Sequence, residues 1–151
     1  MKLTSESEVG RVMYYENQAK LDHIKNYFTL PNEIFHFRLS SGAISVYAFL
    51  LRCEDRTTYE CYPSYSTIGE AVGMSKNTVR KYVKELESAG LIETEHTTVT
   101  LKDGRKRNGN LKYKILPIAD AVEKRFKQQL SKVQFEKTLA DYDEKHGNQA
   151  I

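Results

Sequence analysis

The sequence predicts an α+β fold in which three helices precede a β-hairpin, with a further long helix at the C-terminal end. Apolar residues recur every three or four positions between residues 41 and 90, and they alternate with polar residues between 91 and 116. A mostly charged stretch then runs from Ile118 to His146. The 151 residues divide into an N-terminal arm (1–27), a domain (28–116) and a C-terminal helix (117–151) that is a candidate dimerisation element.

The composition is typical of a folded cytosolic protein. Hydrophobic residues make up 40% of the chain and charged residues 28%, which is enough apolar material for a core. No apolar run reaches the roughly 20 residues that cross a bilayer, and the polar start of the chain has no signal segment. Two cysteines, Cys53 and Cys61, favour a reducing compartment. We expect the two thiols to be packed in the fold or to have no role. A disulfide or a metal site that involves them is the alternative.

The first elements are a short strand and a helix. Arg11–Glu16 has the β-branched and aromatic content of a strand, and apolar residues around Pro31 suggest an anchored segment that leads into the domain. From Ser40 or Ser41, which supplies a serine N-cap, the spacing becomes helical. The predicted inward stripe of this helix is Ala43, Ile44, Tyr47, Ala48 and Leu51.

Two serine-capped helices follow a polar connector, Cys53–Tyr62. Ser64 or Ser66 caps the first of them, and Gly73 ends it in the left-handed conformation that glycine favours. Ser75 caps the second, which stops at Gly90. The predicted inward residues are Ile68, Ala71 and Val72 on the first helix and Val79, Tyr82, Val83 and Leu86 on the second. This spacing is what a helix-turn-helix requires.

A β-hairpin comes next. Leu91–Leu101 reads as one strand and Leu111–Leu116 as its partner, with Asp103-Gly104 as a turn pair. On the return strand we expect Leu111, Tyr113 and Ile115 to face inward and the lysines outward.

The middle of the chain is strongly basic. Residues 76–114 carry ten Lys or Arg and five Asp or Glu, although the net charge of the whole chain is only +3. At 100° per residue, Val83 and Leu86 fall within about 40° of Val79. The opposite side holds Asn77, Arg80, Lys81 and Lys84, with no carboxylate before Glu85. Because solvated helices normally mix charges to gain i,i+4 pairs, a purely cationic and amide face favours an anionic partner over a plain surface helix.

These residue types suit recognition of double-stranded DNA. Arg80 can donate two hydrogen bonds to guanine, and Asn77 can pair similarly with adenine. Lysines 76, 81 and 84 would neutralise phosphates, while Ser75 and Thr78 at the helix N-terminus can reach phosphate oxygens. The candidate contacts on these two helices are Ser64, Ser66, Thr67, Ser75, Lys76, Asn77, Thr78, Arg80, Lys81 and Lys84.

The tip of the hairpin is a second candidate contact. Lys102–Asn110 contains four basic residues and one acid, and it can lie along the DNA backbone or enter a minor groove. The alternative is a hairpin tip that charge merely keeps soluble. The candidate contacts here are Lys102, Arg105, Lys106, Arg107, Asn108 and, on the return strand, Lys112.

The order of these segments resembles a winged helix-turn-helix module over about residues 28–116. The segments that carry the resemblance are Cys61–Gly69, Gly73–Val83 and Leu86–Ile92, with the basic loop as the wing. The resemblance implies that the helix matching Ser75–Ala89 enters the major groove and that the wing contacts the backbone or minor groove. Such modules are common in bacterial transcription regulators and in plasmid or phage replication-initiation proteins. Because no effector domain follows the module, we expect no small-molecule effector, which favours a replication or mobile-element role.

The C-terminal helix has apolar stripes without a strict heptad. Val122, Phe126, Leu130 and Val133 form one stripe, and Phe135, Leu139 and Tyr142 form a displaced one. One interpretation is a helix that pairs two protomers on adjacent DNA half-sites. The other is a helix that folds back over the helix beginning at Ser41 or over the strand at 11–16.

The sequence shows no motif for catalysis or for metal binding. His23, His36, His96 and His146 share no metal-ligand spacing with the cysteines or with one another. The chain has no phosphate-binding glycine loop followed by Lys-Ser/Thr, and no nucleophile beside a base. We therefore expect no enzyme, no catalytic or metal site and no cofactor. The rival to DNA binding is a protein-interaction module on the same scaffold, and RNA binding is a lesser variant.

Overall fold

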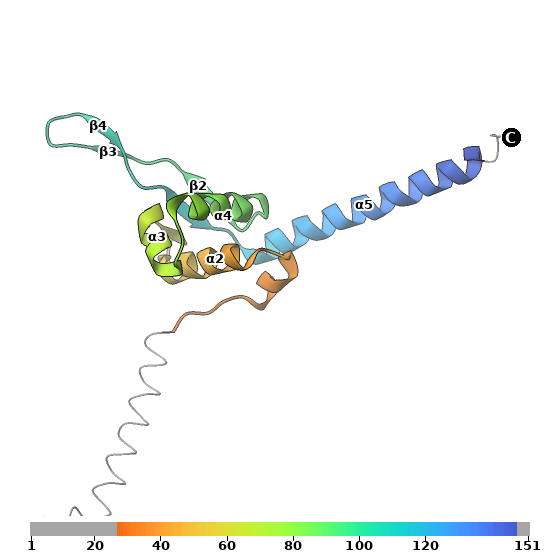
Figure 1. Cartoon of the computed structure of the whole chain (residues 1–151), viewed down its shortest axis with the longest axis horizontal. Coiled ribbons are helices and arrows are strands. Elements are labelled where there is room, and N and C mark those ends of the chain that lie inside the picture. The colour runs from red at the N-terminus through yellow and green to blue at the C-terminus, as the bar shows by residue number, and fades with distance from the viewer. Residues whose placement is uncertain (1–26, 148–151) are drawn as a thin grey trace, which may run out of the picture.

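The structure, a computed structural model, describes residues 27–147. The strand predicted at Arg11–Glu16 lies outside the described residues. In chain order the elements are the 3-10 helix η1 (Asn32–Phe37), helix α2 (Ser41–Cys53), strand β1 (Glu60–Cys61), helices α3 (Tyr65–Val72) and α4 (Lys76–Ser88), strands β2 (Ile92–Glu95), β3 (Thr98–Thr100), β4 (Lys106–Asn108) and β5 (Lys112–Ile115), and helix α5 (Ile118–His146). Figure 1 shows one compact body from which the β3–β4 hairpin and α5 extend in opposite directions.

Helix α2 begins where the sequence predicts, but its buried face is rotated. The hydroxyl of Ser40 accepts the backbone N–H of Ala43 and caps the helix. Ile44, Ala48 and Leu51 are only partly buried, because the run from 43 to 51 is almost continuously apolar and its periodicity does not define one face. Contacts with α3 and α4 define it instead. The fully buried apolar residues of α2 are Ala43, Val46, Tyr47 and Leu50.

The helix-turn-helix forms at the predicted place. Ser64, not Ser66, caps α3 by accepting the N–H of Thr67 at 3.1 Å, and Gly73 adopts a left-handed φ of 70°. The prediction that Ala71 faces the core is wrong, because Ala71 is exposed. Gly69 lies in the interface instead, and any Cβ there would collide with the backbone oxygen of Met74.

Helix α4 buries the predicted side. Ser75 caps it by accepting the N–H of Thr78 at 3.3 Å. Val79, Val83 and Leu86 are buried and Tyr82 is partly buried, as expected. The Tyr82 ring lies against Gly42, where a Cβ would clash with the ring, so α2 and α4 approach closely.

A three-stranded antiparallel sheet closes the body. The strand order is β1-β5-β2, with the inward residues Tyr113 and Ile115 of β5 buried and Leu111 partly buried, as predicted. Strand β1 lies within the segment expected to be a polar connector, where only pairing with β5 reveals it as a strand.

The hairpin is broken into two parts. The strand predicted over Leu91–Leu101 is interrupted at His96-Thr97, where Thr97 exchanges hydrogen bonds with the backbone of Gly109 and Asn110. Beyond this break, β3 and β4 form a separate two-stranded ribbon, so part of the predicted basic loop is a strand. The turn at Asp103-Gly104 is confirmed, with φ of 83° at the glycine.

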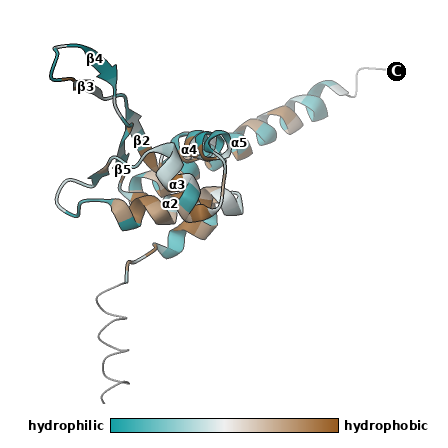
Figure 2. Cartoon of the chain, turned by 60° about the vertical axis from the view of Figure 1, so that its left-hand side comes forward, coloured by the Kyte–Doolittle hydropathy of each residue, from teal (hydrophilic) through white to brown (hydrophobic). Residues whose placement is uncertain are grey.

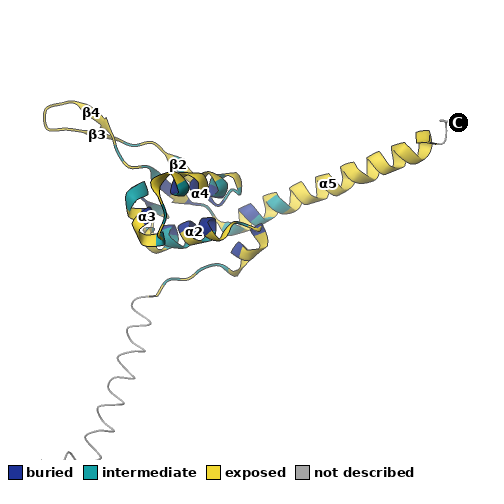
Figure 3. Ribbon diagram, in the orientation of Figure 1, coloured by how far each residue is buried: buried dark blue, intermediate teal, exposed yellow. Residues whose placement is uncertain are grey.

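Helix α5 is anchored at its base and free beyond it. Ala121 is buried, and the guanidinium of Arg125 donates to the carbonyl of Phe37 at 2.9 Å while lying 5.7 Å from that residue's ring centroid. From Phe126 onward the described helix is exposed, so the alternative in which it folds back over α2 is wrong (Figure 3). Within residues 27–147, no helix combines the length and apolar character that a membrane span needs.

Candidate nucleic-acid interface

The solvent-facing side of α4 is the basic surface that the sequence predicts. Its side chains are all exposed, and none of the ion pairs found within residues 27–147 involves them. We call this set the α4 basic face: Lys76, Asn77, Arg80, Lys81 and Lys84. Its charge is therefore available to a partner.

The carboxylates of α4 are directed into the body of the protein. Glu85 accepts hydrogen bonds from the backbone N–H of Ser40 at 2.9 Å and from its hydroxyl at 2.8 Å, which places the acid at the N-terminus of α2. Glu87 accepts from the hydroxyl of Thr94 on β2. An acid beside a helix N-terminus is favoured by the helix dipole. Both acids on α4 are thus used by the fold, and neither compensates the α4 basic face.

Two aromatic rings lie beside cations of this face. The guanidinium carbon of Arg80 is 5.7 Å from the ring centroid of Tyr65 on α3, and the ammonium of Lys81 is 5.7 Å from that of Tyr82. Such cation–π contacts are worth about 0.5–1 kcal/mol at exposed sites. They restrict where the long side chains go without neutralising them. The contact of Tyr65 with Arg80 has no signal in the sequence, because it depends on how α3 crosses α4.

Of the hydroxyl residues proposed as phosphate contacts, Ser64 and Ser75 are helix caps. Ser64 is 2.9 Å from the Thr67 hydroxyl, and Ser75 is 2.8 Å from that of Thr78, in addition to the two backbone bonds described above. Ser66 is partly buried on α3. The cap hydroxyls of Ser64 and Ser75 have partners within the chain, so their first effect is to fix the starts of α3 and α4. The free N–H groups of each first turn then point outward from the cap.

The β3–β4 ribbon, which we call the wing, carries further free cations. Lys102, Lys106, Arg107 and Asn108 are exposed, and the hairpin end stands out as hydrophilic in Figure 2. Arg105 differs, because its guanidinium pairs with Asp103 at 2.6 Å. Hydrogen bonds from Arg105 hold the pKa of the Asp103 carboxyl below its usual value.

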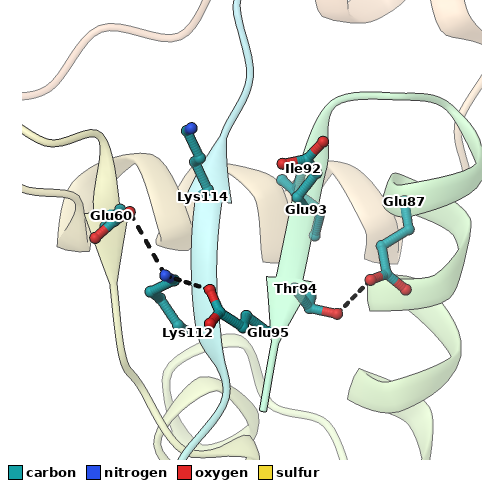
Figure 4. A pocket seen from close by; sticks show the side chains of 8 residues that line it. All are labelled: Glu60, Glu87, Ile92, Glu93, Thr94, Glu95, Lys112 and Lys114. Atoms are coloured by element: carbon teal, nitrogen blue, oxygen red, sulfur yellow. Dashed lines mark hydrogen bonds and ion pairs between the residues drawn. The ribbon is translucent and has the colours of Figure 1, made fainter. Parts of the chain in front are cut away.

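Lys112, another predicted DNA contact, differs from the α4 basic face because its charge is paired within the sheet. Figure 4 shows its ammonium between the carboxylates of Glu95, with which it forms an ion pair, and Glu60, 3.8 Å away. The hydrogen bond between Lys112 and Glu95 lowers the pKa of the Glu95 carboxyl and raises the pKa of the Lys112 ammonium. The hollow around them, about 490 Å³, is lined by Glu60, Glu87, Ile92, Glu93, Thr94, Glu95, Lys112 and Lys114. Four carboxylates and two lysines make it a poor phosphate site.

The two cysteines differ in their exposure to solvent. Cys53 is exposed, whereas Cys61 is buried with its thiol donating to the carbonyl of Leu50, and both are free. Burial raises the pKa of Cys61 to about 12. In the part of the chain that the structure describes, no three His, Cys, Asp or Glu residues are grouped to hold a metal ion.

Comparison with known proteins identifies the central segment. Residues 38–92, which span α2, α3, α4 and the turn into β2, match the family described as a helix-turn-helix domain. No curated protein matches the chain significantly.

Solved structures show a loose likeness of shape. One is a possible transcriptional regulator from Methanosarcina mazei Go1 (TM-score 0.46, 17% identity, 68% of this chain and 79% of that chain). Others are a MarR-family transcriptional regulator from Silicibacter pomeroyi (0.39, 17%, 100% and 98%) and MepR of S. aureus in a complex with DNA (0.38, 15%, 89% and 98%). Likeness at this level does not assign a function.

Proposed function

We propose that this chain, whose residues 38–92 match a helix-turn-helix domain, binds double-stranded DNA through the α4 basic face and the wing. Helix α4 lies in the major groove, and the wing follows the backbone or enters a minor groove. The observation that carries the proposal is the free positive charge of α4, whose only two acids, Glu85 and Glu87, are bound to the protein's own body.

Contacts to phosphate and contacts to bases have different roles in this mechanism. Lys76, Lys81 and Lys84, with the helix N-termini and the free cations of the wing, bind phosphates and fix the position of the protein on the duplex. Arg80 and Asn77 read base edges, Arg80 by two parallel hydrogen bonds to a guanine. The cation–π contact of Arg80 with Tyr65 holds the Arg80 guanidinium near the edge where α3 and α4 meet.

Selection of bound duplexes from a random pool at physiological salt tests the proposal directly. We expect an enriched consensus whose affinity falls as salt rises, because each neutralised phosphate releases counterions. A protein-interaction module on the same scaffold predicts no consensus, and binding to heparin as tight as binding to any duplex. That outcome would reject sequence-specific DNA binding.

The process served is open to two assignments, transcription regulation and replication initiation. Mapping of bound sites in the genome of the source organism separates them. Sites at promoters assign the first, and repeated sites at an origin assign the second.

Pairing of two copies through α5 completes the proposal. Helix α5 leaves the body after its first two turns and exposes apolar side chains along the rest of its described length. Pairing would hold two copies of α4 on neighbouring half-sites and raise their joint affinity through a high effective concentration.

A further inference from the structure

Helix α5 carries two matching sets of apolar side chains on opposite sides. The proximal triplet is Phe126, Leu130 and Val133, and the distal triplet is Phe135, Leu139 and Tyr142. Each has the spacing i, i+4, i+7 that an amphipathic helix uses to dock into an apolar surface. All six side chains are exposed, by 46–59% in the proximal triplet and 47–65% in the distal one.

The two triplets cannot contact the same straight partner. They are nine positions apart, and at 100° per residue this turns the distal triplet about 180° away from the proximal one. Because α5 is one continuous helix (Figure 1), the direction toward a partner helix is the same along its whole length. A single neighbour therefore covers only one triplet of a given copy.

Charge decides which triplets meet. The proximal half of α5, residues 118–133, has four basic and two acidic residues, for a net charge of +2. The distal half, residues 134–146, has four acidic and two basic residues, for a net charge of −2 with His146 neutral. Pairing proximal with proximal, or distal with distal, places like charges together, whereas pairing proximal with distal places opposite charges together.

We propose that the proximal triplet of one copy packs against the distal triplet of a second copy, so that α5 associates head to tail. This inference rests on the pairing through α5 proposed above and specifies its geometry. Such a contact uses two different patches, so it is not two-fold symmetric. Each bound copy still offers one free triplet, and association continues beyond the dimer.

Two matched substitutions test this geometry. Leu130→Asp disrupts the proximal triplet and Leu139→Asp the distal one, with the same chemical change at the same position of each set. Gln134→Asp is the control, because at 100° per residue Gln134 lies about 75° from the mean direction of the proximal triplet and about 105° from that of the distal triplet. All three sites are exposed on α5, so the body keeps its core, and unchanged thermal unfolding verifies this.

The full-length chains are followed by sedimentation velocity from about 1 μM to about 1 mM, a range that covers weak association. For the wild type and Gln134→Asp, we expect the mean mass to rise past that of a dimer. Each leucine variant alone should stay monomeric. An equimolar mixture should form a one-to-one heterodimer, because one variant keeps its distal triplet and the other its proximal triplet.

Other outcomes separate the two proposals. A leucine variant that remains dimeric alone shows a symmetric contact through the other triplet, which overturns head-to-tail association but leaves pairing intact. A mixture that stays monomeric also overturns it. A wild type that is monomeric throughout overturns pairing itself, while DNA binding is judged independently by the duplex selection.

Discussion

Helix α4 and the outer face of the three-stranded sheet both carry lysines, and of these two surfaces only that of α4 is basic. On α4 the cations are free, because the neighbouring acids Glu85 and Glu87 bond to Ser40 and Thr94. On the outer face of the three-stranded sheet, the cross-strand register sets Lys112 beside Glu95 and Lys114 beside Glu93. The difference teaches that the placement of carboxylates, more than the number of lysines, decides whether a surface attracts an anion.

The largest expected effect is on base recognition by α4. Arg80→Ala should weaken binding to the selected duplex by about 1–3 kcal/mol and relax the preference at one base pair, because a forked contact to guanine is lost. Titration of labelled duplexes measures this. Lys114→Ala, on the sheet face, is the matched control and should bind as the wild type does. Equal losses in both variants would contradict the comparison.

A smaller effect should appear in stability rather than in binding. Glu85→Ala removes the acceptor of both Ser40 hydrogen bonds at the start of α2. We expect the free energy of unfolding to fall by about 1–2 kcal/mol, because hydrogen bonds to charged groups contribute about 1.5–3 kcal/mol and these two are exposed to solvent. Urea denaturation measures the loss. The folded variant should keep its DNA affinity. A marked gain in affinity would instead show that Glu85 compensates the α4 basic face.

Phosphate contacts should change the salt dependence. Lys84→Ala should reduce the slope of log affinity against log salt by about 1 and weaken all sequences alike, because one fewer counterion is released. The control is Lys112→Ala, whose charge is already paired with Glu95, and its slope should equal that of the wild type. A lower slope in the control would place Lys112 on the DNA after all.

The smallest effect concerns the sheet pair. Lys112 holds the pKa of Glu95 below its ordinary value. Any stability from this shift is present above the unfolded-state pKa, including at neutral pH, and is lost as pH falls through the folded-state pKa. The loss therefore occurs only under acid conditions. In Lys112→Met, an NMR titration should show the Glu95 pKa moving upward toward its ordinary value. An unchanged pKa would mean that the pair does not form in solution.

The parts of the fold that rest on neighbouring residues were predictable. The caps at Ser64 and Ser75, the left-handed glycine at 73 and the apolar stripe of α4 depend on residues within about one helical turn. The same holds for α5, whose bounds agree with the predicted Ile118–His146. Errors arose where local patterns were ambiguous. The apolar run of α2 is nearly unbroken, so its periodicity does not show which residues lie at the centre of the buried face. Strand β1 has only two residues, too few for an alternating pattern.

The sequence by itself determined which residues of α4 face solvent, because helical periodicity assigns sides without knowledge of the rest of the chain. Only the tertiary structure decided which charges remain free on those sides. Glu85 meets Ser40 across 45 positions, and Lys112 lies between acids from two different strands. Electrostatic compensation depends on distance in space, and that distance is set by packing between elements far apart in the sequence.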